Sequence, residues 1–516
     1  MKANFKILDC TLRDGGYYTN WDFENSTVET YLTNLNSLPV DYLEVGYRNN
    51  PQSEYQGKYF YLPIFELENI RLKSNKKIVI ILNEKDVASE EVKKLLTPCI
   101  GLVDMVRIAL APENLVRALK LAEELRKMSF EVGFNVMYMS KWKETPSFLA
   151  NLSKLGDLAD YFYMVDSYGG VYPNDVVETI ELVRSETNVK LGFHGHNNLE
   201  LALINSLTAV EHGVEMIDST VLGMGRGAGN LKTELLLTVL SSKFGVEVDF
   251  NALGLLVQGF EDLHKKHEWG TNLPYMISGS NSLPQKDVMD WVTARFYSLN
   301  SIVRALNNQS QGLQDNEKFA NLKTDPAKNV LIIGGGPSAQ IHSKAIEEFI
   351  LKSDDIVVIH ASSKNAKHFL HLDVPQYFCL VGNEGYRMEK VFEDISEFHG
   401  KCVLPPFPRK MGTYVPDQIK GKCFELEKVS FTDILNDSHT ALALQTCLNL
   451  QPENIFLAGY DGYFGSELNV LDRLLTKENE TLFSEFIEFT GLDLVSLCPT
   501  LYSSLNISSV YSQIHE

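Results

Sequence analysis

The chain has 516 residues, of which 44% are hydrophobic and 22% are charged, as in soluble globular proteins. One core rarely extends over so long a chain, so two domains are expected. The formal net charge of −20, without a basic cluster, argues against a nucleic-acid partner. No apolar run is long enough to cross a membrane, and no secretory signal is evident at residues 1–7. The seven scattered cysteines favour reduced thiols and hence the cytoplasm.

Short apolar runs alternate with amphipathic segments from residue 5 to about residue 240. Amphipathic segments such as Ala111–Met128 and Asn174–Thr187 are typical of helices that connect parallel strands. Eight alternations in this length predict an α/β fold, a (β/α)8 TIM barrel, with a doubly wound open sheet as the alternative. The predicted strands are Phe5–Cys10, Tyr42–Tyr47, Lys77–Leu82, Asp104–Leu110, Glu131–Tyr138, Tyr161–Ser167, Val189–His194 and Met216–Val221.

Polar residues accompany the ends of these predicted strands, where barrel enzymes carry their active sites. Asn83 and Ser167 fit equally well as helix caps. Polar residues at the ends of so many separate strands indicate a functional site more than a set of unrelated helix caps. The candidates are Arg13, Asp14, Glu44, Arg107, Asn135, Asp166, His194, His196, Asp218 and Thr220.

His194 and His196 are two residues apart at the end of a predicted strand, so their side chains point to the same face. In a closed barrel one strand separates strands one and seven, and Asp14 can therefore approach both histidines. Two imidazoles and one carboxylate suit Mn²⁺, Mg²⁺, Co²⁺ or Zn²⁺, and they also match the non-haem iron triad. Arg13 would either bind a carboxylate and stabilise an enolate, or only neutralise Asp14 or Asp9.

Three motifs together resemble the DRE-TIM (HMGL-like) superfamily of metal-dependent barrel lyases: Asp9–Gly16 (DCTLRDGG), His194–Asn198 (HGHNN) and Gly223–Asn230 (GMGRGAGN). That superfamily includes hydroxymethylglutaryl-CoA lyase, isopropylmalate and homocitrate synthases, and 4-hydroxy-2-oxovalerate aldolase. The resemblance implies a divalent metal, with Mn²⁺ or Mg²⁺ favoured, and a homodimer. The roles it implies are metal ligation by Asp14, His194 and His196, enolate stabilisation by Arg13, and substrate binding by Glu44, Arg107, Asn135, Asp166, Thr220 and Asn230.

Within the superfamily, the chain is most similar to the aldolase branch. Asn198 stands where the Claisen-type synthases usually have aspartate, and the glycine-rich loop lacks the cysteine of the hydroxymethylglutaryl-CoA lyases. The resemblance therefore implies aldol chemistry between a 2-oxo acid such as pyruvate and an aldehyde. The alternatives are a Claisen-type synthase that uses an acyl-CoA, and a non-catalytic protein that binds a nucleotide sugar.

The sequence departs from the 4-hydroxy-2-oxovalerate aldolases at the general base. Those enzymes carry a histidine just after their R-D-G motif, whereas this chain continues Gly16-Tyr17-Tyr18. Tyr17 is the predicted catalytic replacement, and a metal-bound water is an alternative. A tyrosine needs help from a nearby positive charge, because its unperturbed pKa is about 10. The other side chains considered are Tyr18, His264, His267 and Tyr275.

The predicted catalytic domain spans residues 1–305, with helices at Phe250–Lys266 and Asp287–Leu306 and a turn-rich segment at Ser278–Pro284. These helices would cover the barrel mouth or form an interface. A polar linker is expected at 306–328, and a Rossmann-like α/β domain at 329–516. The predicted strands of the second domain are Asn329–Ile333, Asp355–His360, Tyr377–Val381 and Asn454–Ala458.

The second domain contains a glycine-rich turn, Gly334-Gly335-Gly336-Pro337-Ser338, directly after its first predicted strand. Such a turn can cradle a phosphate, or it can be a tight turn without a ligand. No acidic residue ends the next predicted strand, which argues against NAD. The turn and the later segment Ile455–Asp461 loosely resemble sialyltransferase-like and hydroxymethylpterin pyrophosphokinase-like proteins. This resemblance implies a nucleotide or sugar-phosphate ligand near Gly334, Gly336, Ser338 and Asp461.

Overall fold

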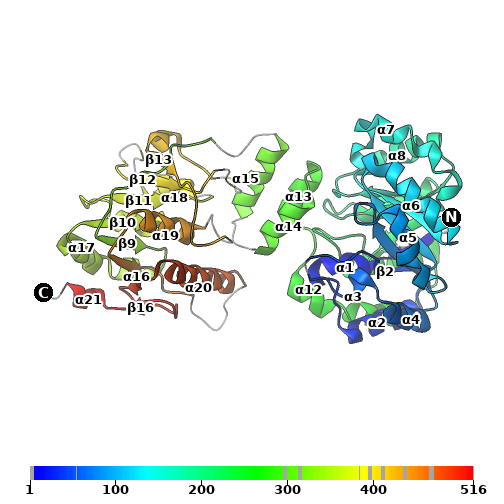
Figure 1. Ribbon diagram of the computed structural model, residues 1–516, viewed down its shortest axis with the longest axis horizontal. Coiled ribbons are helices and arrows are strands. Elements are labelled where there is room, and N and C mark those ends of the chain that lie inside the picture. The colour runs from blue at the N-terminus through cyan, green and yellow to red at the C-terminus, as the bar shows by residue number, and fades with distance from the viewer. Residues whose placement is uncertain are drawn as a thin grey trace. The chain divides into compact units, whose positions relative to one another are not determined.

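The computed structural model describes the chain except residues 1–4, 54, 295–298, 312–316, 383, 393–394, 396–397, 408, 410–412, 434–437, 464–469 and 515–516. It divides into two compact units, Met1–Met289 and Asp290–Glu516. Figure 1 shows a ring of strands and helices in blue to green and a second sheet in yellow to red. No helix in the described ranges is both long and apolar enough to span a membrane.

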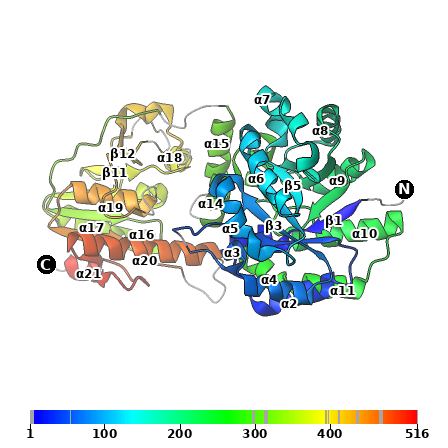
Figure 2. The ribbon, with the colours of Figure 1, turned by 45° about the vertical axis from the view of Figure 1, so that its right-hand side comes forward.

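The first unit is a closed barrel of eight parallel strands in sequence order, as predicted. Figure 2 shows β1, β3 and β5 enclosed by helices. β1 pairs with both β2 and β8, and this pairing closes the barrel. The strands are β1 (Lys6–Asp9), β2 (Tyr42–Tyr47), β3 (Lys77–Asn83), β4 (Met105–Leu110), β5 (Glu131–Val136), β6 (Tyr161–Asp166), β7 (Lys190–Gly195) and β8 (Met216–Ser219).

Helices follow the strands around the outside of the barrel. They are α1 (Thr11–Thr19), α2 (Asn25–Leu35), α3 (Lys58–Tyr61), α4 (Ile64–Lys73), α5 (Ser89–Leu96), α6 (Leu115–Lys127), α7 (Pro146–Leu149), α8 (Pro173–Glu186), α9 (Ala202–Glu211) and α10 (Thr233–Phe244). Further helices are appended: α11 (Phe250–Gln258), α12 (Glu261–His267), α13 (Leu273–Ser280) and α14 (Gln285–Ala294).

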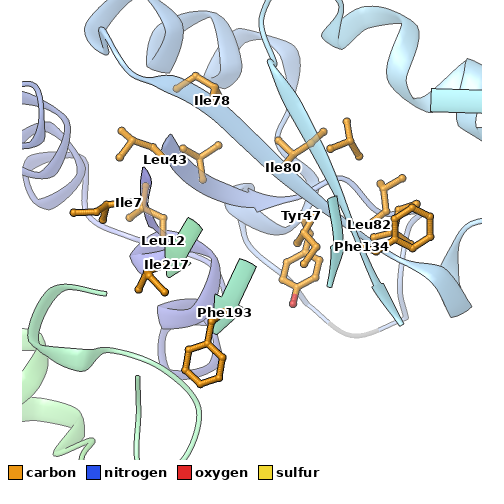
Figure 3. Close-up of a cluster of buried hydrophobic side chains, with 14 of the residues drawn as sticks. Ile7, Leu12, Leu43, Tyr47, Ile78, Ile80, Leu82, Phe134, Phe193 and Ile217 are labelled. Atoms are coloured by element: carbon orange, nitrogen blue, oxygen red, sulfur yellow. The ribbon is translucent and has the colours of Figure 1, made fainter. Parts of the chain in front are cut away.

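Side-chain alternation along the strands separates the outer core from the barrel interior. Phe193 and Ile217 belong to the large hydrophobic cluster between strands and helices, part of which Figure 3 shows. Their neighbours His194 and Asp218 have the opposite orientation, because successive side chains on a strand alternate. Leu12 belongs to the same outer cluster, so its packing against the core orients the first turn of α1.

Two expectations for the appended segments are wrong in detail. The predicted helix Phe250–Lys266 is two helices, α11 and α12, which separate at Gly259 after the end of α11. Within the predicted helix Asp287–Leu306 the structure describes α14 and α15 (Leu299–Ser310), and its continuity stays a prediction because residues 295–298 lie outside the described part of the chain. The segment predicted to be turn-rich contributes Ser278–Ser280 to α13.

The second unit contains an eight-stranded parallel sheet in the order β13-β12-β11-β10-β9-β14-β15-β16. Hydrophobic clusters cover both faces, which makes it a doubly wound sheet. The strands are β9 (Asn329–Ile333), β10 (Ile356–His360), β11 (Gln376–Cys379), β12 (Lys401–Leu404), β13 (Cys423–Glu425), β14 (Asn454–Ala458), β15 (Leu494–Ser496) and β16 (Asn506–Ile507). The helices are α16 (Pro337–Ile341), α17 (Ser343–Lys352), α18 (Glu384–Val391), α19 (His439–Asn449), α20 (Val470–Thr490) and α21 (Val510–Gln513).

The segment predicted to be a linker is ordered where the structure describes it. Its first residues belong to α15, which ends at Ser310. Its later part joins the second sheet region, since the Leu322 amide donates to the Glu425 carbonyl at 2.8 Å. The domain boundaries at 1–305, 306–328 and 329–516 remain a prediction, and the division by compactness falls at Met289.

Candidate active site

Arg13 and Asp14 lie in the first turn of α1, close to the end of the first strand. α1 begins two residues after β1 ends, so both side chains stay close to the carboxyl end of the barrel. Both are buried, with 6% and 2% of their surfaces exposed. A charged pair at this depth is stable only if other polar groups surround it.

Two buried arginines hold the carboxylates of this site. Arg13 Nη1 pairs with Asp14, and Arg13 Nε donates to Glu44 Oε2 at 2.6 Å. Arg107 Nη2 donates to Asp218 Oδ2 at 2.8 Å, and its Nη1 lies 3.4 Å from Glu44 Oε1. Burial by itself would raise the pKa of Asp14 and of Asp218. Arg13 together with His194, His196 and Asn230 outweighs burial at Asp14, and Arg107 together with His194 outweighs it at Asp218, so both pKa values lie below their usual range.

Each of the two histidines uses Nδ1 for an internal hydrogen bond. His194 Nδ1 lies 2.9 Å from Asp218 Oδ2, and His196 Nδ1 lies 2.7 Å from the main-chain oxygen of Asp166. His194 Nε2 faces Asp14, 3.6 Å from Oδ2. Burial, reinforced by His194, lowers the pKa of His196 to about 3, so this imidazole is neutral. A ring held through Nδ1 presents the lone pair of Nε2, as metal-ligating histidines do.

These residues fit a divalent cation. Asp14 Oδ2 accepts a hydrogen bond from Asn230 Nδ2 at 2.7 Å, and Asn230 Oδ1 is buried without a hydrogen-bond partner among the described residues. Imidazole nitrogens, a carboxylate and an amide oxygen are donors that Mn²⁺, Mg²⁺, Co²⁺ and Zn²⁺ accept. The structure thus brings together Asp14, His194, His196 and Asn230, which come from α1, β7 and the glycine-rich loop.

A different trio, Cys10, His194 and Asp218, has donor atoms that all lie within 4.8 Å of one another. Its carboxylate is already bound to Arg107 and to His194 Nδ1. Burial raises the pKa of the Cys10 thiol well above its usual range, so the thiol is protonated. The chemistry of the donors therefore favours Asp14, His194 and His196.

The residues predicted to bind substrate occupy different surroundings. Glu44 and Arg107 belong to the buried charge network, and Asn135 Oδ1 accepts from Arg107 Nη2. The Asp166 carboxylate accepts from the amides of Gly170 and Val171 at 3.2 and 3.3 Å, so it faces its own loop; burial raises its pKa to about 6. The Thr220 hydroxyl is buried and has no hydrogen-bond partner in the described ranges.

Tyr17 lies beside Trp21, Tyr47 and Arg226, and its ring centroid is 5.0 Å from that of Trp21. Burial and the neighbouring Tyr17 raise the pKa of Tyr47 well above its usual range. The Arg226 guanidinium carbon is 5.1 Å from the centroid of the Tyr17 ring. Tyr17 is therefore a hydroxyl next to a cation, the environment that a tyrosine acid/base needs.

The other side chains considered for the base are less suitable. Tyr18 donates to the Gly227 carbonyl at 3.2 Å, and burial raises its pKa. His264 Nε2 lies 3.1 Å from the Trp269 carbonyl, and its ring packs against that indole. Burial lowers the pKa of His267, which packs against Tyr18.

The appended helices pack over the carboxyl end of β7. Asn198 Nδ2 donates to the Tyr275 carbonyl and to Gln285 Oε1, each at 2.9 Å. Thr271 Oγ1 donates to the Asn197 carbonyl at 2.9 Å. These bonds tie the segment that follows the histidines to α13 and α14. Asn198 thus anchors these helices and lies outside the set of metal donors.

In the second unit, the predicted ligand residues also come together. Asp461 accepts from the Ser338 amide at 3.0 Å and from the Ser338 hydroxyl at 2.9 Å. A Cβ on Gly336 would lie 2.0 Å from Asp461 Oδ2. Asn365 Nδ2 donates to the carbonyls of Gly334 and Gly336. The groups that a phosphate would use are thus bound by the chain's own carboxylate, which favours a tight turn without a ligand.

Sequence reasoning did not assign roles to three residues of the barrel site: Tyr47, Asp218 and Arg226. Asp218 is a strand-end candidate to which the sequence assigns no role, and Tyr47 occupies a strand-end position of the same kind at the end of β2. Arg226 interrupts the glycines of the Gly223–Asn230 loop. Its position against Tyr17 depends on the fold, because the two are more than 200 residues apart.

The fold and the site define a class: a (β/α)8 barrel with imidazole, carboxylate and amide groups brought together at its carboxyl end. A family model described as HMGL-like matches residues 104–256. A 4-hydroxy-2-oxovalerate aldolase from Roseiflexus sp. (strain RS-1) is 30% identical over 266 residues, which cover 49% of this chain and 74% of the relative. The chain belongs to the HMGL-like family, the DRE-TIM metallolyase superfamily.

Other relatives share the same half of the chain. An oxaloacetate decarboxylase from Mycobacterium tuberculosis (strain ATCC 25618 / H37Rv) is 27% identical over 252 residues, 46% of this chain and 70% of the relative. Among solved structures, the N-terminal domain of a Bacteroides vulgatus protein, described provisionally as an aldolase, is 57% identical with a TM-score of 0.56. The match covers 58% of this chain and all of that domain.

Proposed function

We propose that the protein is a divalent-metal-dependent aldolase that makes or breaks a carbon–carbon bond between a 2-oxo acid such as pyruvate and an aldehyde. One observation carries the proposal. Both histidines are held through Nδ1 beside Asp14 and Arg13, so that two imidazole Nε2 atoms, a carboxylate and a guanidinium meet in one site. The aldolase relatives, about 30% identical, support this choice within the family.

Asp14, His194 and His196 would hold the metal, with Asn230 beside them. When bound, the cation supplies Lewis-acid polarisation of the 2-oxo group. Mn²⁺ or Mg²⁺ is the proposed ion. The fixed tautomers of the two histidines orient their Nε2 atoms before any ligand arrives, and Asp218 is the residue that fixes the tautomer of His194.

Arg13 stabilises the enolate oxygen in this proposal. Its Nε and Nη1 are bound to Glu44 and Asp14, whereas Nη2 is buried and has no hydrogen-bond partner in the part of the chain that the structure describes. A guanidinium fixed by two carboxylates leaves one donor for the negative charge that develops on the substrate. The ion pairs with Glu44 and Asp14 thus hold Arg13 Nη2 in position before the substrate binds.

Tyr17 is the proposed acid/base. In the cleavage direction it takes the proton of the 4-hydroxyl, the C3–C4 bond breaks, and the aldehyde leaves. The electron pair passes to the 2-oxo group as an enolate facing Arg13, and protonation at C3 gives the 2-oxo acid. Tyr47, whose pKa is raised by burial and by Tyr17, lies next to this acid/base.

Methyl-proton exchange tests the proposal. The full-length protein is incubated with pyruvate in D₂O and Mn²⁺, and the methyl signal is followed by NMR. We expect loss of the signal, its abolition by a chelator or by Asp14→Asn, and an exchange rate lowered roughly 10²- to 10³-fold in Arg13→Lys, which keeps the charge but loses the two-sided pairing. Absence of exchange with every divalent ion tested would refute the proposal.

Decarboxylation of oxaloacetate is a second candidate function, since a relative with that name is 27% identical. It would use the same enolate and the same Arg13, with CO₂ as the leaving group in place of an aldehyde. Oxaloacetate consumption, measured beside aldol product formation from pyruvate and aldehydes, separates the two. Thiol release from acetyl-CoA would instead indicate the Claisen-type synthase.

The proposed enzyme acts in the cytoplasm as a homodimer. The seven cysteines are free and buried in the structure, which supports a reducing compartment. Size-exclusion chromatography with light scattering tests the dimer. The second unit has no proposed ligand, because Asp461 occupies the turn where a phosphate would bind.

A further inference from the structure

Arg226 is a cation without a carboxylate partner in the described part of the chain, which distinguishes it from the two buried arginines of the site. Arg13 is paired with Asp14 and Glu44, and Arg107 is paired with Glu44 and Asp218. Arg226 is partly buried, and it contacts the face of the Tyr17 ring. A guanidinium that is withdrawn from water and left unpaired is suited to binding an anion.

The backbone around Arg226 is fixed by its glycine neighbours. A Cβ on Gly225 would lie 2.5 Å from Asn230 Nδ2, and Gly227 has a φ of +68°, which side chains rarely adopt. The Arg226 carbonyl accepts from the Gly229 amide at 3.3 Å, and the Gly227 carbonyl accepts from Tyr18. The loop therefore holds the backbone of Arg226 in one conformation beside the site, so ligand binding costs little conformational entropy there.

The ionisable groups that act on Arg226 leave its charge available. Tyr17 first, and then Asp14, Tyr47 and Tyr138, raise the pKa of Arg226, and they are three phenols and one carboxylate. Asp14 is already bound to Arg13 and Asn230. Tyr138, in a left-handed conformation with φ of +61°, packs against the Tyr168 ring. The surroundings of Arg226 are thus tyrosine rings and hydroxyls, with no free negative charge among the described groups.

We infer that Arg226 binds an anionic group on the aldehyde, so that the second substrate is an aldehyde carrying a carboxylate or a phosphate. The inference rests on the proposed function and specifies its substrate class. Arg13 contacts Asp14 and serves the 2-oxo acid, whereas Arg226 contacts Tyr17, the acid/base of the aldehyde-derived hydroxyl. The cation next to Tyr17 is therefore on the aldehyde side of the bond that forms. Carboxylate and phosphate both accept paired hydrogen bonds from a guanidinium.

The test compares kcat/KM for matched aldehydes with pyruvate, Mn²⁺ and the full-length protein. Succinic semialdehyde is paired with butanal, and glyceraldehyde 3-phosphate with glyceraldehyde. We expect one charged aldehyde to exceed its neutral partner by about 10- to 100-fold, and the ratio to fall by a similar factor in Arg226→Gln. Arg226→Lys should keep part of the preference. Lys232→Gln, which removes an exposed cation just beyond the loop, should keep all of it.

Which charged aldehyde is preferred identifies the anion as carboxylate or phosphate. The ratio is unaffected by a general loss of activity, so a poorly folded variant does not imitate the expected result. The inference is overturned if pyruvate exchange proceeds but the wild type shows no preference for either charged aldehyde, or if Arg226→Gln keeps the preference. Absence of pyruvate exchange in the wild type overturns the proposed function itself.

Discussion

At the scale of single residues, Asp218 joins the two parts of the active site. It accepts from Arg107 at 2.8 Å and lies 2.9 Å from His194 Nδ1, so one carboxylate balances a buried cation and fixes the tautomer of a proposed metal ligand. The side chain is buried, with 2% of its surface exposed. Its contribution is therefore to position His194.

Asp218→Asn should weaken metal binding by about 10- to 100-fold, the cost typical of losing a hydrogen-bonded partner of a ligating histidine. The side-chain amide of the variant can still contact His194 Nδ1. It no longer provides the carboxylate that keeps the proton on Nδ1 and leaves Nε2 free for the metal. Mn²⁺ titration followed by electron paramagnetic resonance measures the affinity. Asp157→Asn, at an exposed position, is the matched control, and equal affinities in the two variants would contradict this role.

Much of this site could be predicted from local sequence. The histidines are two residues apart at the end of β7, and Arg13 and Asp14 follow β1 closely. Their positions relative to the predicted strands were therefore enough to propose that they form one site. The network that prepares them could not be predicted in the same way. Arg107 and Asp218 are 111 positions apart, and their pairing depends on β4 and β8 facing one interior. Arg226 and Tyr17 are likewise far apart in the sequence, and only the folded barrel brings them into contact.

At the scale of elements, Glu384 links three segments of the second unit. This buried residue begins α18, accepts from the Ser363 amide at 2.7 Å and from Arg387 at 2.9 Å, and lies 3.4 Å from His439 at the start of α19. Burial by itself would raise the pKa of Glu384. The contacts with His439, Arg387 and Ser363 outweigh burial and lower the pKa to about 2.

Glu384→Gln should reduce the free energy of unfolding of the second unit by about 3 kcal/mol at pH 7. A carboxylate whose pKa is lower in the folded state stabilises the fold above its unfolded pKa of about 4.5. That stability is lost as pH falls toward about 2, so the variant and wild type should converge in that direction. Urea unfolding at several pH values, followed by hydrogen exchange of α18 and α19, measures the difference.

The control for this prediction is Glu389→Gln, on the same helix, where the carboxylate accepts a hydrogen bond from the Tyr414 hydroxyl at 3.0 Å. A change within about 0.5 kcal/mol is expected there. A constant gap between Glu384→Gln and wild type from pH 7 to pH 3 would show that the charge of Glu384 does not stabilise this region.

Element positions were predictable where hydrophobic runs were long. β2, β9 and β14 have the predicted bounds, and the other predicted strands differ by one or two residues at an end. The strands β12, β13, β15 and β16 were not predicted, because they have two to four residues each and no distinct period. The division of Phe250–Lys266 into two helices depends on Gly259, whose Cβ position lies 2.8 Å from Thr30 Cγ2.

At the scale of the whole molecule, the two units differ in whether the polar groups of their candidate sites already have hydrogen-bond partners. The barrel carries the unsatisfied polar atoms of the site, including Arg13 Nη2, Thr220 Oγ1 and Asn230 Oδ1. In the second unit the glycine-rich turn is satisfied by Asp461 and Asn365. A divalent metal should therefore stabilise the first unit.

Hydrogen–deuterium exchange with and without Mn²⁺ tests this distinction. Protection should increase around residues 9–17, 190–198 and 223–230, because an ion bound at 100 times its Kd adds about 2.7 kcal/mol to the stability of the state that binds it. Peptides at 334–338 and 459–461 serve as the internal control. Protection confined to those second-unit peptides would contradict the account.

The central claim is that Asp14, His194 and His196 hold one divalent cation. The most direct measurement is an anomalous diffraction map of the full-length protein crystallised with Mn²⁺. The account predicts one strong peak between the Nε2 atoms of the two histidines and the Asp14 carboxylate, which is retained in Cys10→Ser and lost in His196→Ala. A peak bound to Cys10 and Asp218 instead, or no peak at saturating Mn²⁺, would contradict it.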